Sequence, residues 1–185
     1  MIIGLTGLAA CGKSTISHYL KNSHNFQFLI FSDILKEEAK KRGLFNESMP
    51  LEEQKMTLSR FGDQWRKETG KNDIIAIKLI EKIKEENLEN IVIDGFRAPA
   101  EVDLFRENFK DFTLIFVDTS VENRFERRKL DDPNTNLEDL QKRDKSDIDN
   151  KSMDKVFETA DKKIENNRTK EELYEKIENI INLKS

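Results

Sequence analysis

The chain has little of what extracellular, membrane and metal-cluster proteins are built from. It contains a single cysteine in 185 residues, which excludes an internal disulfide and favours a reducing, intracellular setting. The two histidines, His18 and His24, have no partners at ligand spacing, so we expect surface or packing roles for them. No apolar run approaches the length of a membrane span, and the N-terminus lacks a basic leader segment. We therefore expect a soluble, cytoplasmic protein without a membrane partner.

A large excess of one charge sign is absent as well. The 32 basic and 36 acidic residues give a formal net charge of −4, which does not favour nucleic acid or an anionic membrane as a partner. Hydrophobic residues make up 36% of the chain and charged residues 37%. A core is therefore available beneath an unusually charged surface, and the length fits one domain over 1–185.

Short apolar runs alternate with helical patterns along the chain. Because these runs are continuous rather than alternating, they are typical of strands buried on both faces of a parallel sheet. The segments expected to form strands are 2–6, 26–31, 89–94, 112–117 and, more weakly, 162–165. Helical patterns occupy 13–22, 33–42, 51–68, 72–86 and 169–183. This order predicts a three-layer α/β fold, with a central parallel sheet of about five strands. The most polar stretch, 129–147, is expected to be a mobile excursion.

The strongest pattern runs from Gly7 to Ser14 and fits G-x-x-x-x-G-K-[ST], after a strand and at the start of a helix. Its glycines let successive backbone N–H groups point at phosphate oxygens, and the helix N-terminus adds the positive end of its dipole. Lys13 would reach the β- and γ-phosphates, and the Ser14 hydroxyl would hold Mg²⁺. A chance match occurs in roughly one chain per hundred of this length. The pattern predicts a P-loop NTPase fold in which the nucleotide-binding residues include Gly7, Leu8, Ala9, Ala10, Cys11, Gly12, Lys13, Ser14 and Thr15.

Two further patterns favour packing over chemistry. Cys11 lies inside the phosphate loop, where an exposed thiol near a helix N-terminus could have a lowered pKa. We favour the simpler interpretation, an ordinary small residue tolerated in the loop. In the helix expected over 51–68, Leu51, Leu58, Phe61 and Trp65 fall on one face. This stripe indicates helix packing, and a base-stacking role for Trp65 is secondary.

A second chemical signal is the carboxylate that ends the third predicted strand, in Ile-Val-Ile-Asp94. A residue at the carboxyl end of a buried parallel strand faces the crevice where α/β proteins bind ligands. Asp94 could instead cap a helix, because Pro99 follows shortly. Paired with the phosphate loop, the interpretation of Asp94 as a metal-binding residue is favoured.

These residues carry a resemblance to a known family. Asp94-Gly95-Phe96-Arg97 resembles the Asp-Gly-Phe-Pro-Arg element of adenylate kinases and other nucleoside monophosphate kinases, with the proline absent. Residues 32–36, Ser-Asp-Ile-Leu-Lys, resemble their acceptor-side Gly-Asp-Leu-Leu-Arg segment. The likeness covers most of the chain. It is closest to a group of uncharacterised archaeal P-loop proteins that are related to nucleotide kinases and dephospho-coenzyme A kinase and share the Ser-Asp-x-Leu, Asp-Gly-x-Arg and Asp-Asp-Pro elements.

The resemblance implies roles for residues outside the phosphate loop. An acceptor-binding excursion over about 32–70 and a short lid over about 129–144 are expected. Asp33, Lys36, Arg66 and Arg97 are the candidates for contacting the acceptor, with Arg60 beside Arg66 as a further one. Arg60 and Arg66 could instead each be plain surface charge. Asn167, in the loop after the fifth strand, is expected to lie where that loop holds adenine.

Arginines of the lid segment are expected to close over the transferring phosphoryl group. On resemblance, Arg127 and Arg143 are the ones we favour, together with Lys13 and Asp33 as catalytic residues. For Arg124 a functional role and a solvated face, paired with Glu122 and Glu126, are equally supported. For Arg128 we favour the solvated face.

Together these features predict a kinase that uses ATP and Mg²⁺ to phosphorylate a small acceptor, foremost a nucleoside or deoxynucleoside monophosphate. An acceptor phosphate is already ionised at neutral pH, so no general base is needed, in keeping with the lack of a His or Cys cluster. Two alternatives stay open. Dephospho-coenzyme A kinase would phosphorylate a hydroxyl and need a base, for which Asp33 is the candidate. A nucleotide-switch ATPase or assembly factor is disfavoured by the arginines of the lid segment.

Overall fold

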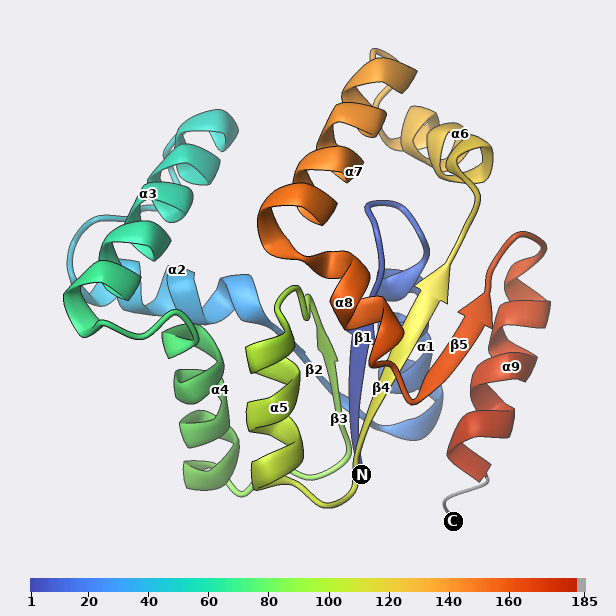
Figure 1. Ribbon diagram of the computed structural model, residues 1–185, viewed down its shortest axis with the longest axis horizontal. Coiled ribbons are helices and arrows are strands. Elements are labelled where there is room, and N and C mark those ends of the chain that lie inside the picture. Colours follow the sequence, from blue (N-terminus) through green and yellow to red (C-terminus); the bar gives the residue numbers. More distant parts are fainter. Residues whose placement is uncertain (183–185) are drawn as a thin grey trace.

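A five-stranded parallel sheet forms the centre of the molecule, with the strands in the order β2-β3-β1-β4-β5 (Figure 1). The computed structural model describes residues 1–182, with the backbone alone at positions 51, 52, 55, 150 and 151. The strands are β1 (Ile2–Thr6), β2 (Gln27–Ile30), β3 (Ile91–Asp94), β4 (Phe112–Asp118) and β5 (Lys162–Glu165). This sheet, flanked by helices, confirms the predicted α/β fold.

The three central strands, β1, β3 and β4, are mostly apolar and buried because each has a packed layer on both faces, whereas the edge strand β5 is mostly exposed. Neighbouring side chains alternate between the two faces, as the pleat requires. Ile2 and Leu114 therefore lie in one core cluster, and Ile3 and Ile115 in the other. Helices α2 (Phe31–Lys41), α4 (Ile74–Glu85) and α5 (Pro99–Asn108) cover the first face, and α1 (Lys13–His24) and α9 (Lys170–Asn182) the second.

The remaining helices extend beyond the carboxyl ends of the strands or connect back to the sheet. Helix α3 (Leu51–Thr69) rises beside α2, and α6 (Val121–Asp131) and α7 (Leu137–Lys151) rise above the carboxyl end of β4 (Figure 1). Helix α8 (Met153–Glu158) then leads down to β5. The candidate site lies at this carboxyl edge of the sheet.

The structure corrects the sequence-based prediction at several places. The polar stretch 129–147, for which no helix was predicted beyond residue 130, consists mostly of the end of α6 and most of α7. Helix α7 starts at a local signal, because the Asn136 side chain caps it by accepting a hydrogen bond from the Asp139 amide at 2.8 Å. Helices α5 and α8 were not predicted, and β2 passes into α2 at Phe31 without a loop. Helices α5 and α8 escaped prediction because they are short or poor in the apolar period that indicates a helix.

The packing stripe of α3 is confirmed where its side chains are described. Phe61 and Trp65 are buried and stacked on each other at 5.5 Å between ring centroids. Arg42 lies over both rings, so Trp65 serves the core. The side chain of Leu51 and position 183 of the last predicted helix lie outside the described residues.

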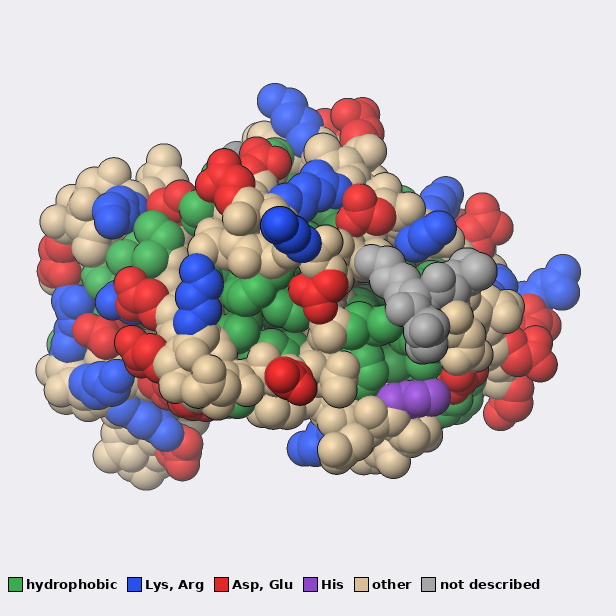
Figure 2. All heavy atoms as spheres, turned by 90° about the horizontal axis from the view of Figure 1, so that it is seen from below, with side chains coloured by type: hydrophobic (Ala, Val, Ile, Leu, Met, Phe, Trp, Pro, Cys, Tyr) green, Lys and Arg blue, Asp and Glu red, His purple; other side chains and the backbone are tan. Residues whose placement is uncertain are grey.

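Charged side chains of both signs cover the end of the molecule opposite the site. In Figure 2, basic and acidic side chains are interspersed around exposed hydrophobic ones. Within residues 1–182, no helix is both long enough and apolar enough to cross a bilayer.

Candidate functional site

The phosphate loop begins where the sheet order changes direction. Strand β1 lies between β3 and β4, so the chain leaving β1 opens into the crevice at the sheet's topological switch point, where α/β folds bind ligands. The Thr6 hydroxyl donates to the Phe96 carbonyl oxygen at 2.9 Å. This bond ties the end of β1 to the segment after β3, so the loop and Asp94 are held on the same edge.

Gly7 and Gly12 of the loop adopt positive φ angles, and neighbouring atoms leave no room for a Cβ at either position. Gly7 has φ +144°, and a Cβ there would lie 2.5 Å from the Val117 carbonyl oxygen. Gly12 has φ +108°, and its Cβ would lie 2.3 Å from Nδ2 of Asn166. Real Cβ atoms do not approach backbone or amide atoms so closely. The loop therefore packs directly against β4 and the β5–α9 connection.

A comparison of two glycine substitutions tests this packing. Gly43 also has a positive φ, +69°, but no described heavy atom lies within 4 Å of a Cβ placed there. We expect Gly43→Ala to cost about 1–2 kcal/mol, the strain of a left-handed conformation alone. Gly12→Ala should cost about 3 kcal/mol or more, because it must also displace Asn166. Thermal unfolding measures both, at about 2–4 °C per kcal/mol for a chain of this size. Equal losses would contradict the close packing at Gly12.

Lys13, the first residue of α1, is held by the loop itself. Its Nζ donates to the carbonyl oxygens of Gly7 at 2.9 Å and Leu8 at 3.2 Å, and lies 3.6 Å from Sγ of Cys11. An ammonium donates but cannot accept, so these contacts occupy its protons without neutralising its charge. The side chain is half-buried and lines two neighbouring cavities, one on each side of the loop.

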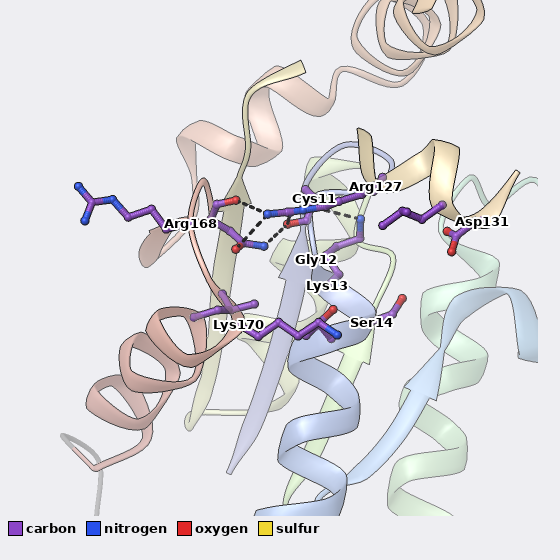
Figure 3. A pocket seen from close by; sticks show the side chains of 13 residues that line it. Cys11, Gly12, Lys13, Ser14, Arg127, Asp131, Arg168 and Lys170 are labelled. Atoms are coloured by element: carbon purple, nitrogen blue, oxygen red, sulfur yellow. Dashed lines mark hydrogen bonds between the residues drawn. The ribbon is translucent and has the colours of Figure 1, made fainter. Parts of the chain in front are cut away.

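The larger cavity, of about 500 Å³, lies between the start of α1, α6 and the β5–α9 connection (Figure 3). It brings together most of the predicted nucleotide-binding residues with several from the end of the chain. Its lining consists of Ala10, Cys11, Gly12, Lys13, Ser14, Thr15, Arg127, Leu130, Asp131, Asn166, Arg168, Lys170 and Leu173. Backbone N–H groups at the start of α1 and basic side chains from three elements make this cavity suitable for an anion.

Arg127 closes one wall of this cavity. Its guanidinium donates to the carbonyl oxygens of Asn166 at 2.8 Å and Cys11 at 3.3 Å, as the dashed lines in Figure 3 show. Asn166 is buried and donates in turn to the Cys11 carbonyl oxygen at 2.8 Å. Burial lowers the pKa of Arg127. Arg127 thus stands beside the phosphate loop and the β5–α9 connection, rather than in the cavity that Arg143 lines.

The smaller cavity, of about 130 Å³, lies on the other side of Lys13. It is lined by Gly7, Ala9, Lys13, Ile30, Asp94, Gly95, Phe96, Arg97, Arg143, Asp147 and Met153. Six of the predicted site residues thus meet here, namely Gly7, Ala9, Lys13, Asp94, Arg97 and Arg143, from the phosphate loop, the end of β3 with the turn after it, and α7. Two arginines and a lysine face two carboxylates across a small volume.

Asp94 is the unusual group of this cavity. Its Oδ1 is buried and has no hydrogen-bond partner within the described part of the chain. Burial raises the pKa of this carboxyl group, and the positive charges of Lys13 and Arg97 oppose the rise. A buried polar atom without a partner is rare in proteins and demands an explanation. An oxygen donor left unpaired beside a phosphate loop fits a hard divalent cation such as Mg²⁺, and the Ser14 hydroxyl is a donor of the same kind.

Where adenylate kinases carry a proline after the phenylalanine of Asp-Gly-Phe-Pro-Arg, this chain has Arg97. The backbone amide of Arg97 donates to Glu101 Oε2 at 2.8 Å, and the amide of Ala98 donates to the same oxygen at 3.1 Å. Proline has no amide hydrogen and could not make the first bond. The carboxylate of Glu101 caps α5 and orders the turn that presents Arg97. Burial raises the pKa of Glu101, although both amides oppose the rise.

Three predicted acceptor residues are not brought to either cavity. Asp33 and Lys36 pair with each other on α2, with Nζ 2.9 Å from Oδ1. Arg66 on α3 donates to the Asn72 carbonyl oxygen at 3.2 Å and to Asp63 at 3.4 Å, and Arg60 is exposed. The Asn167 side chain accepts from the Ser120 amide at 2.8 Å, at the start of α6. Its neighbours Asn166 and Arg168 line the larger cavity instead.

Burial bears on two interpretations of single residues. Cys11 is buried and the pKa of its thiol is raised, chiefly by burial, in keeping with the favoured interpretation of an ordinary small residue in the loop. Arg124 is also buried and pairs with Asp144, not with Glu122 or Glu126 on a solvated face. Sequence reasoning singled out the run Asn166-Asn167-Arg168-Thr169 and chose Asn167 from it, whereas Asn166 and Arg168 line the larger cavity. It missed Glu101.

Comparisons with known proteins identify the family and the fold of this chain. An AAA domain family model matches residues 3–156. A UPF0200 protein from Methanoregula boonei is 32% identical over 183 residues, covering 97% of this chain and 95% of the relative. Another, from Methanothermobacter thermautotrophicus, is 31% identical over 151 residues, covering 80% and 72%.

Solved structures show the same fold at lower identity. A protein from Thermus thermophilus has a TM-score of 0.65 at 17% identity, over 100% of this chain and 98% of that one. Shikimate kinase from Aquifex aeolicus has a TM-score of 0.54 at 22% identity, over 100% and 96%. The fold is therefore that of P-loop kinases. The chain belongs to the AAA domain family of P-loop kinase-like proteins and, within it, to the archaeal UPF0200 proteins.

Proposed function

We propose that the protein is a kinase that transfers the γ-phosphoryl group of Mg-ATP to a small acceptor, foremost a nucleoside or deoxynucleoside monophosphate. One observation carries the proposal. Lys13 lines both cavities, so a donor phosphate chain in the larger one and an acceptor in the smaller one would meet at its ammonium group. Phosphoryl transfer needs such positioning and positive charge more than it needs covalent chemistry from the protein.

The larger cavity suits the donor. The loop amides and the N-terminus of α1 would bind the β- and γ-phosphates, with Lys13 exchanging the Gly7 and Leu8 carbonyl oxygens for phosphate oxygens. Arg127 lines the larger cavity but not the smaller one, so the rest of the nucleotide would extend past it, toward the loop in which Asn167 follows the lining residue Asn166. Ser14 and Asp94 would hold Mg²⁺, and the chemistry it would supply there is neutralisation of the charge that develops on the phosphoryl oxygens.

The smaller cavity suits the reacting end of the acceptor. Arg97 and Arg143 would hold an acceptor phosphate, whose oxygen attacks the γ-phosphorus while the bond to the β–γ bridging oxygen breaks and ADP leaves. The acceptor oxygen carries no proton, so none has to be removed. Residues 32–70, including Asp33, Lys36 and Arg66, would then bind the rest of the acceptor. The segment 129–144, which carries Arg143, would cover the site and exclude water.

The proposal is tested by ADP release from Mg-ATP, measured against a panel of nucleoside monophosphates, deoxynucleoside monophosphates and dephospho-coenzyme A. We expect one monophosphate to raise the rate far above the rate with ATP alone. Hydrolysis that depends on Lys13 but responds to no acceptor would contradict a small-molecule kinase and favour a nucleotide switch.

A hydroxyl acceptor, as in dephospho-coenzyme A, is the second candidate. It is favoured by the position of Asp33, a partly exposed carboxylate just after β2, whose ion pair with Lys36 withdraws that lysine from the role of a free phosphate ligand. Such an acceptor needs Asp33 as a general base. Asp33→Asn should then lower kcat by about 10²-fold or more.

On a monophosphate acceptor, Asp33→Asn should cause only a partial loss, because no proton is removed. Steady-state kinetics on the best acceptor of the panel decide between the two. The matched control is Asp103→Asn, the same substitution at an exposed position of α5 that lines neither cavity, which should change neither kcat nor KM.

A further inference from the structure

The most extensive buried ion pair in the described chain joins α6 to α7. Arg124 makes two parallel bonds to Asp144, from the two terminal nitrogens to Oδ1 at 3.0 Å and Oδ2 at 2.6 Å. The exposed fractions of the two side chains are 4% and 12%. A pair so shielded from water is scarcely screened, and removing one partner would leave a buried charge without compensation.

The same guanidinium also contacts the phosphate loop. Its Nε donates to the Thr119 carbonyl oxygen at 3.1 Å, and one terminal nitrogen donates to the Ala9 carbonyl oxygen at 3.3 Å. Arg124 therefore connects three segments that are far apart in sequence, namely the phosphate loop, the end of β4 and α7. A lysine could not do this, because it lacks the planar fork of donors.

Helix α7 has few apolar contacts to hold it in place. Leu140 is its buried large hydrophobic residue among those described, while Asp144 and Asp147 are its buried acidic ones. Arg143, next to Asp144, is exposed to solvent and lines the smaller cavity with Lys13 and Asp94. The orientation of α7 thus decides whether Arg143 faces the reacting groups.

We propose that Arg124 and Asp144 are positioning residues, which hold α7 against the phosphate loop so that Arg143 faces the cavity between Lys13 and Asp94. This inference rests on the proposed kinase function for its kinetic consequence. A merely structural pair would stabilise the fold without acting through Arg143. The two possibilities differ in whether the effects of Asp144 and Arg143 are additive.

A double-mutant cycle between Asp144 and Arg143 tests the proposal. We expect Asp144→Asn to lower kcat about tenfold or more, because small misplacements of a positioned group are costly. Arg143→Ala should lower kcat about 10²-fold. In the Arg143→Ala background, Asp144→Asn should cost less than about twofold further, because its effect passes through the missing side chain. Full additivity would overturn the positioning role.

Further variants guard against loss of folding. Arg124→Lys keeps the charge but not the fork, and should repeat the kcat loss of Asp144→Asn with a milder effect on Tm. The matched control is Glu81→Gln, the same carboxylate-to-amide change in the exposed Lys78–Glu81 pair on α4. It should leave kcat unchanged. A loss in the control as large as that of Asp144→Asn would also overturn the proposal.

Hydrogen exchange separates this proposal from the proposed function. Backbone amides of α7 should exchange faster in Asp144→Asn than in wild type, while those of α5 should not. This readout needs no acceptor, so it remains decisive if every acceptor fails and the kinase function is contradicted. Unchanged exchange in α7 would show that the pair does not hold the helix.

Discussion

Replacing Lys13 with alanine should lower kcat for phosphoryl transfer by about 10²–10³-fold, the cost of removing one preorganised donor from developing charge. Lys13 supplies the positive charge that both cavities share. Water entering the vacated space would solvate phosphate oxygens but could not be oriented in advance by the loop. The rate of ADP release at saturating Mg-ATP and acceptor measures the effect.

The structure offers a close control on the same helix. Lys21 is exposed on α1, two turns beyond the phosphate loop, and Lys21→Ala should leave kcat and KM within about twofold of wild type. Both variants should keep Tm near that of wild type, because neither ammonium group is fully buried. A Lys13→Ala chain retaining a tenth or more of wild-type activity would contradict the shared role of this residue.

Asp94→Asn should lower activity and raise stability together. Loss of the carboxylate should reduce kcat by about 10²-fold and require more Mg²⁺ for half-maximal rate, since an amide oxygen is a weaker cation ligand. Without ligands, however, the buried unpartnered carboxylate opposes folding. A neutral amide of the same size is less costly to bury, so unfolding should become less favourable by about 1 kcal/mol at neutral pH.

The stability gain of Asp94→Asn should depend on pH in a definite direction. The folded chain binds the Asp94 proton more tightly than the unfolded chain does, because the pKa is raised above its ordinary value of 3.8. Below that value both states are protonated and the carboxylate has no cost. As pH rises from 3.8 through the raised pKa, the wild type loses stability relative to the variant, and the difference then stays constant. Denaturant unfolding at several pH values measures it.

Asp118→Asn is the matched control for both effects. Asp118 also ends a strand at the same edge, β4, but its carboxylate is partly exposed and paired with Lys163 at 2.8 Å. The substitution should leave kcat unchanged and alter stability by less than about 1 kcal/mol, as for an exposed ion pair. If Asp94→Asn proved less stable than wild type, the Asp94 carboxylate would not be an uncompensated buried charge.

Sequence-based prediction succeeded where the determining interactions are local. The continuous apolar runs predicted four strands well and a fifth weakly, because burial on both faces removes the need for polar positions. The strand–loop–helix arrangement around residues 7–14 was predicted, since it depends on eight consecutive residues and on the helix that begins within them. The placement of Asp94 at the end of β3 was predicted for a similar reason, because the carboxyl end of a parallel strand faces the crevice in folds of this class.

Other features depend on which segments the fold brings together, and no local pattern encodes them. The close contact at Gly12 is made by Asn166, which is more than 150 residues away in sequence, so no local pattern could predict it. Arg124 sits between Glu122 and Glu126 in sequence, yet its partner is Asp144 on another helix. A charged residue cannot reveal from its neighbours whether it will be buried, because burial is set by the elements packed upon it.

For the same reason the polar helix α7 was not predicted, since it is anchored by buried carboxylates and Leu140 rather than by an apolar stripe. The sequence by itself thus determined the sheet and the strand–loop–helix unit over residues 2–24, because the interactions that form them are local. Tertiary structure alone decided which charges meet around Lys13, because that depends on contacts between distant segments.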